Sequence, residues 1–166
     1  QYLLALDKCL KQAVKPVLVH IISFSDLPTE EEIKDYGLEI MSREEFIEMQ
    51  NKEKVGESLR KFKNKEISVL YSTKCKRGVD FPGDSCDSII LTKYPYPNVN
   101  SLFWKILRQT HPKQYNKFYL DKAWREFLQR IYRGLRSKDD HIFLLSPDIR
   151  VFQHAEKLAN NSFKNT

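Results

Sequence analysis

Several motifs that mark independent catalytic centres are missing from this sequence of 166 residues. It contains no G-x-x-x-x-G-K-[ST] phosphate loop, no G-x-G-x-x-G turn, no H-E-x-x-H pair and no G-x-S-x-G elbow. These absences exclude the common forms of nucleotide-binding, zinc-protease and serine-hydrolase sites. The histidines are scattered, and His20 and His141 fall in predicted strands, where we expect hydrogen-bonded core or edge residues rather than ligands. We therefore expect neither a metal site nor an independent catalytic centre in this chain.

Cysteine is scarce, and long apolar runs are absent. The three cysteines, Cys9, Cys75 and Cys86, form no C-x-x-C pair, and their odd number and spacing suit neither a disulfide framework nor a zinc site. Free thiols in a reducing compartment are expected. No apolar run approaches the ~20 residues that cross a bilayer, and no signal-peptide pattern is present. These features predict an intracellular protein without membrane contact, cytoplasmic in a prokaryote or nuclear in a eukaryote.

The basic residues are concentrated in one part of the chain. The formal net charge is +6, and residues 104–138 contain ten Lys or Arg against two acidic residues, whereas residues 30–57 contain ten acidic against four basic ones. A basic region favours a polyanionic partner, although a solvated Lys-rich helix has the same composition. Hydrophobic residues make up 41% of the sequence, enough for one domain over residues 1–166. Because both methionines are internal and the chain begins with Gln1, we expect a piece of a longer protein.

Short β-branched runs alternate with helical patterns along the chain. Strands are expected at 17–22, 67–71, 88–91 and 141–145, with a brief edge strand at 38–41. Helices are expected at 2–14, from Thr29, from Ser42 to 64, at 99–109, at 113–136 and from Ile149. Ser42 and Glu45 have the spacing of an N-terminal capping box. The alternation predicts an α/β sandwich with a mostly parallel central sheet and helices on both faces.

The stretch 121–136, D-K-A-W-R-E-F-L-Q-R-I-Y-R-G-L-R, carries two stripes if it forms one helix. The apolar stripe, which can pack on the sheet, consists of Trp124, Phe127, Leu128, Ile131 and Leu135. The polar stripe consists of Arg125, Gln129, Arg133 and Arg136, spaced four, four and three residues apart. Like charges one turn apart repel, and a bound anion would offset that repulsion, although a solvated basic face is the simpler alternative. Arg130 is rotated off the polar stripe and is expected to tolerate alanine.

This stretch resembles motif VI of superfamily 2 helicases of the xeroderma pigmentosum group D and DinG type, A-x-R-x-x-x-Q-x-x-G-R-x-x-R. The matching positions are Ala123, Arg125, Gln129, Arg133 and Arg136. Tyr132 stands where the family has glycine. Residues 77–83, R-G-V-D-F-P-G, resemble motif V of the same family, with Arg77 in place of its usual acidic residue.

Three further segments are similar to the same helicases. They are the buried strand 17–24 of motif IV, the aromatic-proline turn Y-P-Y-P at 94–97, and the strand with a D-x-R-x-F end at 141–152. The resemblance covers residues from about 15 to 152 in the family's order. It implies a RecA-like lobe, the second motor lobe of an ATP-dependent DNA helicase.

The resemblance also implies roles for individual residues. Arg133 and Arg136 would act on the γ-phosphate of ATP as arginine fingers, with Gln129 orienting that site. The implied nucleotide contacts are Gly78, Asp80 and Arg125. The implied DNA contacts are Ser23, Ser72, Thr73, Lys74, Lys76 and Arg77. Hydroxyls, amides and lysines contact phosphates without reading the bases, so we expect nonspecific, salt-sensitive binding of single-stranded DNA.

The remaining machinery would lie on a first RecA-like lobe of the same polypeptide. That lobe would carry the P-loop and bind most of ATP and Mg²⁺, and many relatives also carry an iron–sulfur cluster there, for which this chain has no place. The chain alone is expected to be a monomer without ATPase activity. Two other functions remain open: a non-catalytic nucleic-acid-binding or adaptor domain with a degenerate helicase fold, and an unrelated Rossmann-like binder of small molecules.

Overall fold

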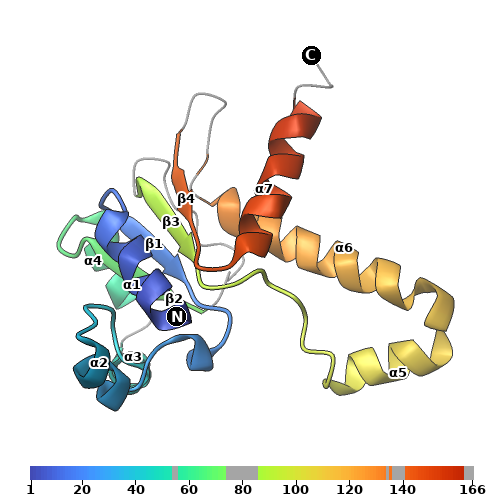
Figure 1. The fold of residues 1–166 in the computed structure, drawn as a ribbon, viewed down its shortest axis with the longest axis horizontal. Coiled ribbons are helices and arrows are strands. Elements are labelled where there is room, and N and C mark those ends of the chain that lie inside the picture. Colours follow the sequence, from blue (N-terminus) through green and yellow to red (C-terminus); the bar gives the residue numbers. More distant parts are fainter. Residues whose placement is uncertain (54–55, 74–85, 134, 136–140, 163–166) are drawn as a thin grey trace.

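The computed structural model describes residues 1–53, 56–73, 86–133, 135 and 141–162, which are built around a four-stranded parallel sheet (Figure 1). The strands are β1 (Val17–His20), β2 (Val69–Ser72), β3 (Ser88–Leu91) and β4 (Phe143–Leu145), in the spatial order β2-β1-β3-β4. Val17 of β1 lies opposite Val69 of β2 and Ser88 of β3. Because every pairing is parallel, all four strands end at the same edge of the sheet.

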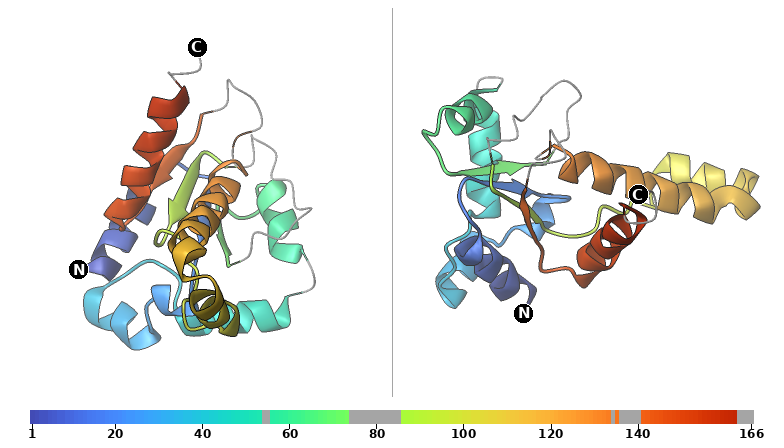
Figure 2. Two further views of the ribbon diagram at one scale, coloured as in Figure 1. Left: turned by 90° about the vertical axis from the view of Figure 1, so that its right-hand side faces the viewer. Right: turned by 90° about the horizontal axis from the view of Figure 1, so that it is seen from above.

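Helices cover both faces of this sheet (Figure 2). The helices are α1 (Tyr2–Gln12), α2 (Glu30–Tyr36), α3 (Arg43–Lys52), α4 (Glu57–Lys63), α5 (Leu102–Thr110), α6 (Pro112–Ile131) and α7 (Ile149–Ser162), with a 3-10 turn η1 at Phe24–Asp26. One apolar core lies between the sheet and helices α1, α2 and α3, and the other lies between the sheet and helices α4, α6 and α7. The predicted α/β sandwich with a parallel sheet is confirmed. Among the described helices, none is long and apolar enough to cross a membrane.

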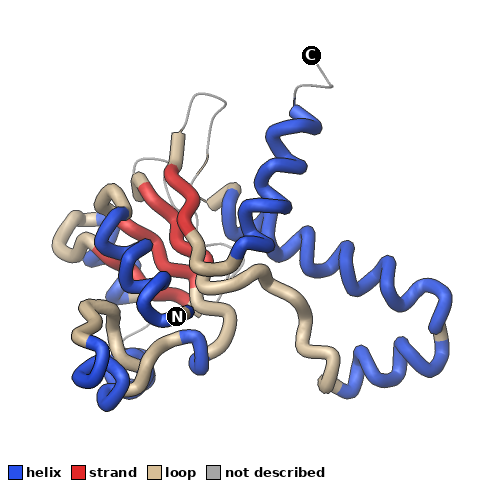
Figure 3. The backbone as a smooth tube through the Cα atoms, in the orientation of Figure 1, coloured by secondary structure: helices blue, strands red, loops and turns tan. Residues whose placement is uncertain are grey.

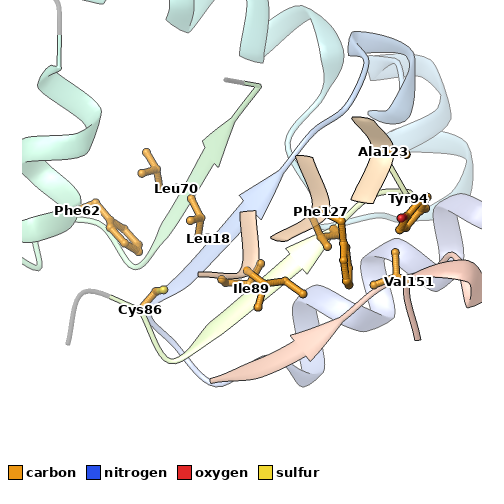
Figure 4. Close-up of a cluster of buried hydrophobic side chains, with 11 residues drawn as sticks. Leu18, Phe62, Leu70, Cys86, Ile89, Tyr94, Ala123, Phe127 and Val151 are labelled. Carbon is orange, nitrogen blue, oxygen red and sulfur yellow. The ribbon is translucent and has the colours of Figure 1, made fainter. Parts of the chain in front are cut away.

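Successive side chains of the central strands pack alternately into the two cores on opposite faces of the sheet. Leu18 and Ile89 contribute to the core that contains Phe127 of α6 (Figure 4), whereas Val19 and Ile90 contribute to the core that contains Phe46 of α3. All residues of β1 and β3 are buried, as predicted for strands covered on both faces. Each fully buried side chain of this size stabilises the fold by about 1.5–3 kcal/mol.

Hydroxyl side chains begin the two helices that follow β1. Thr29 forms a complete capping box on α2: its Oγ1 accepts from the Glu32 amide at 3.2 Å, and the Glu32 carboxylate accepts from the Thr29 amide at 2.8 Å. At the start of α3, Ser42 Oγ accepts from the Glu45 amide at 3.0 Å, which confirms the Ser42 half of the predicted capping box. Gly37 ends α2 with a φ of 62°, a left-handed conformation that favours glycine.

The predicted edge strand at 38–41 is wrong. Its backbone amides bond to side chains instead of to a neighbouring strand: the Glu39 amide donates to the Asp7 carboxylate at 2.7 Å, and the Met41 amide donates to the Tyr71 hydroxyl at 3.2 Å. Leu38 and Ile40 are buried in the core, so the apolar pattern of this segment reflects burial and not a strand.

The prediction of one helix over 113–136 is wrong at its carboxyl end. Helix α6 ends at Ile131, and Arg133 lies in the turn that follows. Tyr132 caps the helix in a right-handed conformation, with φ −68° and ψ −8°, and its amide donates to the Leu128 carbonyl at 2.9 Å. An ordinary φ means that tyrosine is accommodated here without strain in place of the glycine of related helicases.

Helices α5 and α6 form an arm that extends away from the sheet (Figure 3). Contacts between aromatic rings join the arm to the turn after β3. Tyr119 of α6 stacks on Tyr96 with ring centroids 5.6 Å apart and planes 4° apart. The ring of Trp104 on α5 lies nearly perpendicular to the rings of Tyr115 and Tyr119, with ring centroids 5.8 and 5.4 Å apart. We call these four residues the aromatic ladder.

Candidate functional site at the carboxyl edge of the sheet

The carboxyl ends of the strands bring several predicted site residues to one edge. His20 ends β1 and leads to Ser23, while Ser72 ends β2 and leads to Thr73. Since His20 lies opposite Ser72 in the parallel pairing, these two segments leave the sheet side by side. Open α/β sheets bind their ligands outside this edge.

Asp26 fixes the ends of β1 and β3 relative to each other. One oxygen of its buried carboxylate accepts from the amides of Ile22 and Ser23 at 3.0 and 2.8 Å and from the Thr92 hydroxyl at 2.8 Å. Its other oxygen lies 2.8 Å from the ammonium of Lys93. Sequence reasoning missed this network, although the S-x-x-D spacing of Ser23 and Asp26 is a capping-box signal that predicts it.

The predicted DNA contacts that the structure describes are half-buried residues of this edge. The Ser23 hydroxyl lies 2.9 Å from the Ser25 hydroxyl, and the Thr73 hydroxyl lies 3.5 Å from the Gln50 amide nitrogen. The main-chain carbonyl of Ser72 accepts from Ile21 at 2.9 Å, which keeps the two strand ends together. Five further predicted site residues lie outside the described residues: Lys74, Lys76, Arg77, Gly78 and Asp80.

The end of α6 approaches the same edge. Arg133 is half-buried and lies close enough to His20 for its positive charge to lower the pKa of the imidazole. Gln129 is exposed on the last turn of α6, and Arg125 is exposed one turn earlier, on the arm. The structure therefore brings Arg133 and the ends of β1 and β2 together and separates Arg125 from them. Arg136 lies outside the described residues.

His20 differs from the hydrogen-bonded residue that we predicted. Its ring is fully buried, and within the described part of the chain neither ring nitrogen has a hydrogen-bond partner. Burial lowers the pKa of His20 well below its usual value of 6.5, and the charges of Arg130 and Arg133 lower it further, against a smaller opposing effect of the Arg130 main chain. A neutral imidazole therefore lies beneath the two arginines at physiological pH.

Arg130, which was expected to tolerate alanine because it is rotated off the polar stripe, lies on the buried face of α6. The residue is 7% exposed, and its Nε and Nη1 atoms lack hydrogen-bond partners among the described residues. Among the described residues, the guanidinium forms an ion pair with Glu126, at 4.0 Å. The spacing contained the signal: Ala123, Phe127 and Arg130 recur at helical intervals on the buried face of α6. Replacing a buried charge of this kind is not a neutral change.

Two of the segments that resemble helicases contact each other beside this edge. The Asp148 carboxylate accepts from the Tyr94 amide at 2.9 Å and pairs with Arg150 at 2.7 Å. Arg150 lies 5.4 Å from the centre of the Tyr96 ring. Burial raises the pKa of Asp148, but the bonds from Arg150 and Tyr94 outweigh it, so the pKa is lowered and the carboxylate is charged near neutral pH. The aromatic-proline turn and the D-x-R segment thus form one structural unit.

Comparison with known proteins places this fold and edge in a family. No curated protein matches the sequence of the chain. A family profile, described as the helicase C-terminal domain, matches residues 6–165 and so covers nearly the whole chain, including all four strands and the end of α6. The parallel sheet with helices on both faces is consistent with the RecA-like fold of such domains. The chain therefore belongs to the helicase C-terminal domain family.

Proposed function

We propose that the chain is the second motor lobe of an ATP-dependent DNA helicase of the xeroderma pigmentosum group D and DinG type. Membership of the helicase C-terminal domain family indicates helicase activity and interaction with nucleic acid and nucleotide in general. The finer proposal is carried by one observation: Arg133, in the turn after α6, is near enough to the end of β1 for its charge to lower the pKa of the buried His20, which lies opposite Ser72 of β2. The turn that carries Arg133 of motif VI therefore approaches the end of β1, the strand of motif IV, and the neighbouring end of β2, after which motif V follows in the sequence.

Arg133 and Arg136 are proposed to stabilise the charge that develops on the γ-phosphate of ATP. Guanidinium groups suit this role because they stay ionised and can donate two hydrogen bonds to two phosphate oxygens. The neutral His20 adds no further positive charge next to Arg133, which limits the repulsion that the edge must bear. Gln129 would orient the site. The further nucleotide contacts proposed are Gly78 and Asp80, whereas Arg125, which the structure separates from this edge, is not assigned to the nucleotide.

ATP is the substrate in this proposal, and a first RecA-like lobe would hold its P-loop contacts and Mg²⁺. Within the described residues, no group of three or more His, Cys, Asp or Glu side chains converges to hold a metal ion. We therefore assign to this chain only the contribution of positive charge across the cleft. An iron–sulfur cluster, where the parent protein has one, would lie on the first lobe.

The DNA is proposed to run along the carboxyl edge. Ser23, Ser72 and Thr73 supply hydroxyl groups at the ends of β1 and β2, as hydrogen-bond partners for phosphate oxygens. Three basic residues that follow Thr73 in the sequence are proposed as further phosphate contacts: Lys74, Lys76 and Arg77. Such contacts read the backbone rather than the bases, so binding is nonspecific and falls as the salt concentration rises.

The proposal is tested by ATP hydrolysis of the two-lobe protein that contains this chain. Arg133→Ala and Arg136→Ala should each lower DNA-stimulated hydrolysis by about a thousand-fold or more, because an arginine finger contributes on this scale. Arg133→Lys should restore little, since an ammonium cannot reproduce the planar fork of the guanidinium. Binding of a fluorescent ATP analogue should persist in all three variants, which separates loss of catalysis from loss of folding.

Arg60→Ala is the matched control. Arg60 is an exposed arginine of α4 whose ion pair with Glu66, at 3.6 Å, contributes little at the surface. Arg130→Ala is unsuitable because its side chain is buried. If hydrolysis falls equally in the Arg60 and Arg133 variants, or falls only in step with the melting temperature, Arg133 is structural and the arginine-finger assignment is wrong.

A further inference from the structure

The arm formed by α5 and α6 carries a hollow of about 510 Å³. Phe103 and Trp104 of α5 and Phe118 of α6 line it. Trp104 is buried, whereas Phe103 is 64% exposed and Phe118 is 49% exposed. Two aromatic rings are thus held in solvent on opposite helices, around a space within the usual range of ligand pockets, ~300–1,000 Å³. Exposed apolar clusters of this kind mark interaction sites.

Positive charge surrounds the same hollow. Lys122 and Arg125 line it, four and seven residues after Phe118 on the same face of α6. Arg125 has no ion-pair partner within the described residues, and the ion pair of Lys122 with Glu126, at 2.9 Å, is exposed and therefore easily exchanged. Residues 102–125 contain six Lys or Arg against one acidic residue.

The positive charge around the hollow indicates which class of ligand it binds. The cores of protein interfaces are depleted in lysine, whereas surfaces that bind single strands combine a basic groove with aromatic rings on which bases stack. We propose that the hollow binds single-stranded nucleic acid, with bases stacked on Phe103 and Phe118 and phosphates paired with Lys122 and Arg125. Asp121, which also lines the hollow, is placed to accept a hydrogen bond from a base amino group.

Phe103, Trp104 and Phe118 lie on α5 and the first half of α6, which extend from the sheet (Figures 1 and 3), so this site is a second contact, separate from the ends of β1 and β2. Lys122 and Arg125 continue its lining on the second half of α6. The inference rests on the proposed function for the class of ligand. The inferred site differs from the edge in its chemistry of recognition, since the edge is proposed to bind phosphates alone, whereas the hollow also binds bases through their faces.

Binding to a fluorescein-labelled oligodeoxycytidylate tests the inference on the 166-residue chain. A length of about 20 nucleotides exceeds the ~4–16 nucleotides that one small binding fold covers. Phe103→Ala and Phe118→Ala should each weaken binding by about 5-fold to 100-fold at low salt, the range for loss of one base–aromatic stack. Phe118→Trp should retain affinity, whereas Phe118→Leu should not, because only a ring can stack.

Two exposed apolar residues of the arm provide matched controls. Ile106 of α5 and Leu120 of α6 are about as exposed as Phe118 but do not line the hollow. Ile106→Ala and Leu120→Ala should leave the affinity unchanged. An abasic strand of the same length should bind the Phe103 and Phe118 variants as well as it binds the unmodified chain, since it has charge but no bases.

The outcomes separate this inference from the proposed function. If Lys74→Ala/Lys76→Ala weakens binding while the Phe103 and Phe118 variants do not, the inference fails and the track along the edge stands. The reverse pattern supports the hollow and contradicts the edge. Equal losses on the abasic strand, or a change in sedimentation without a change in DNA affinity, would overturn the stacking site in favour of a structural role or a second copy of the chain.

Discussion

The buried imidazole of His20 makes the stability of this domain depend on pH. Its nitrogens lack hydrogen-bond partners among the described residues, and its pKa lies well below 6.5 because of burial and of the charges on Arg130 and Arg133. The unfolded chain therefore binds a proton on His20 below about pH 6.5 that the folded protein does not bind. Wherever the unfolded state holds the extra proton, the free energy of unfolding falls as the pH falls.

This dependence gives a prediction for urea unfolding between pH 7 and pH 5. The free energy of unfolding should fall with a slope approaching about 1.4 kcal/mol per pH unit below pH 6.5, the value for one proton. His20→Leu should remove that slope, because leucine binds no proton and fills a similar space. The pKa values of Asp7 and Asp148 are lowered from 3.8, so the stabilisation that these two carboxylates provide is lost at a more acidic pH than the effect of His20.

The matched control for His20 is His141→Asn. His141 is exposed, so its replacement should leave the slope as it is in the unmodified chain. A slope that persists in His20→Leu would show that other groups set the acid sensitivity and that the neutral His20 is not the cause.

Individual residues of the site differ in how far the sequence predicts them. The strand pattern places Ser23 and Ser72 near the ends of strands, because such positions follow from local chemistry. Arg133 was expected inside a helix and lies in the turn after it. Arg130 was assigned to the wrong environment, since a charged side chain was taken as exposed although its position on α6 repeats the interval of the buried residues. The unpartnered state of His20 depends on which side chains converge from β1 and α6, which spacing alone does not specify.

At the scale of elements, the aromatic ladder holds the arm in place. Tyr119 contacts rings on both sides, Tyr96 and Trp104, and its hydroxyl donates to the Pro97 carbonyl at 3.3 Å. Tyr119→Ala should lower the free energy of unfolding by about 2 kcal/mol or more, from lost packing and lost ring contacts. Tyr119→Phe keeps the ring and should cost only about 0.5–1.5 kcal/mol, the contribution of one hydrogen bond.

Urea unfolding with near-ultraviolet circular dichroism measures both effects. Lys117→Ala, an exposed change on the same helix, is the control and should stay within about 0.5 kcal/mol of the unmodified chain. Equal costs for the alanine and phenylalanine variants at Tyr119 would mean that the ring contacts do not hold the arm.

Elements were predicted best where one local pattern decides them. β1 and β3 are continuous apolar runs, and α2 and α3 begin at capping residues, so their positions follow from the sequence. The segment 38–41 has a strand's composition, but two of its backbone amides donate hydrogen bonds to the side chains of Asp7 and Tyr71, which lie 32 and 30 residues away along the chain. Partners this distant are decided by the tertiary fold and not by local propensity.

At the scale of the whole molecule, the sheet order brings together strand ends that lie far apart in the sequence. Motifs IV and V follow β1 and β2, which are neighbours in the order β2-β1-β3-β4, and the turn after α6 reaches the end of β1. Alternation of strands and helices predicts the layers, but the order of the strands and the approach of α6 emerge only in three dimensions. In the proposed function, a lobe with this arrangement offers positive charge to a nucleotide whose P-loop contacts lie on another lobe.

ATP hydrolysis by the highly purified 166-residue chain, compared with the two-lobe protein in the presence of single-stranded DNA, tests the central claim most directly. The account predicts no turnover by the chain alone and DNA-stimulated turnover by the two-lobe protein, because the P-loop lysine and the acidic residue that hold phosphates and Mg²⁺ are supplied by the first lobe. Turnover by the chain alone, or a two-lobe protein that binds DNA without hydrolysing ATP, would contradict the assignment of this chain as the second lobe of a helicase motor.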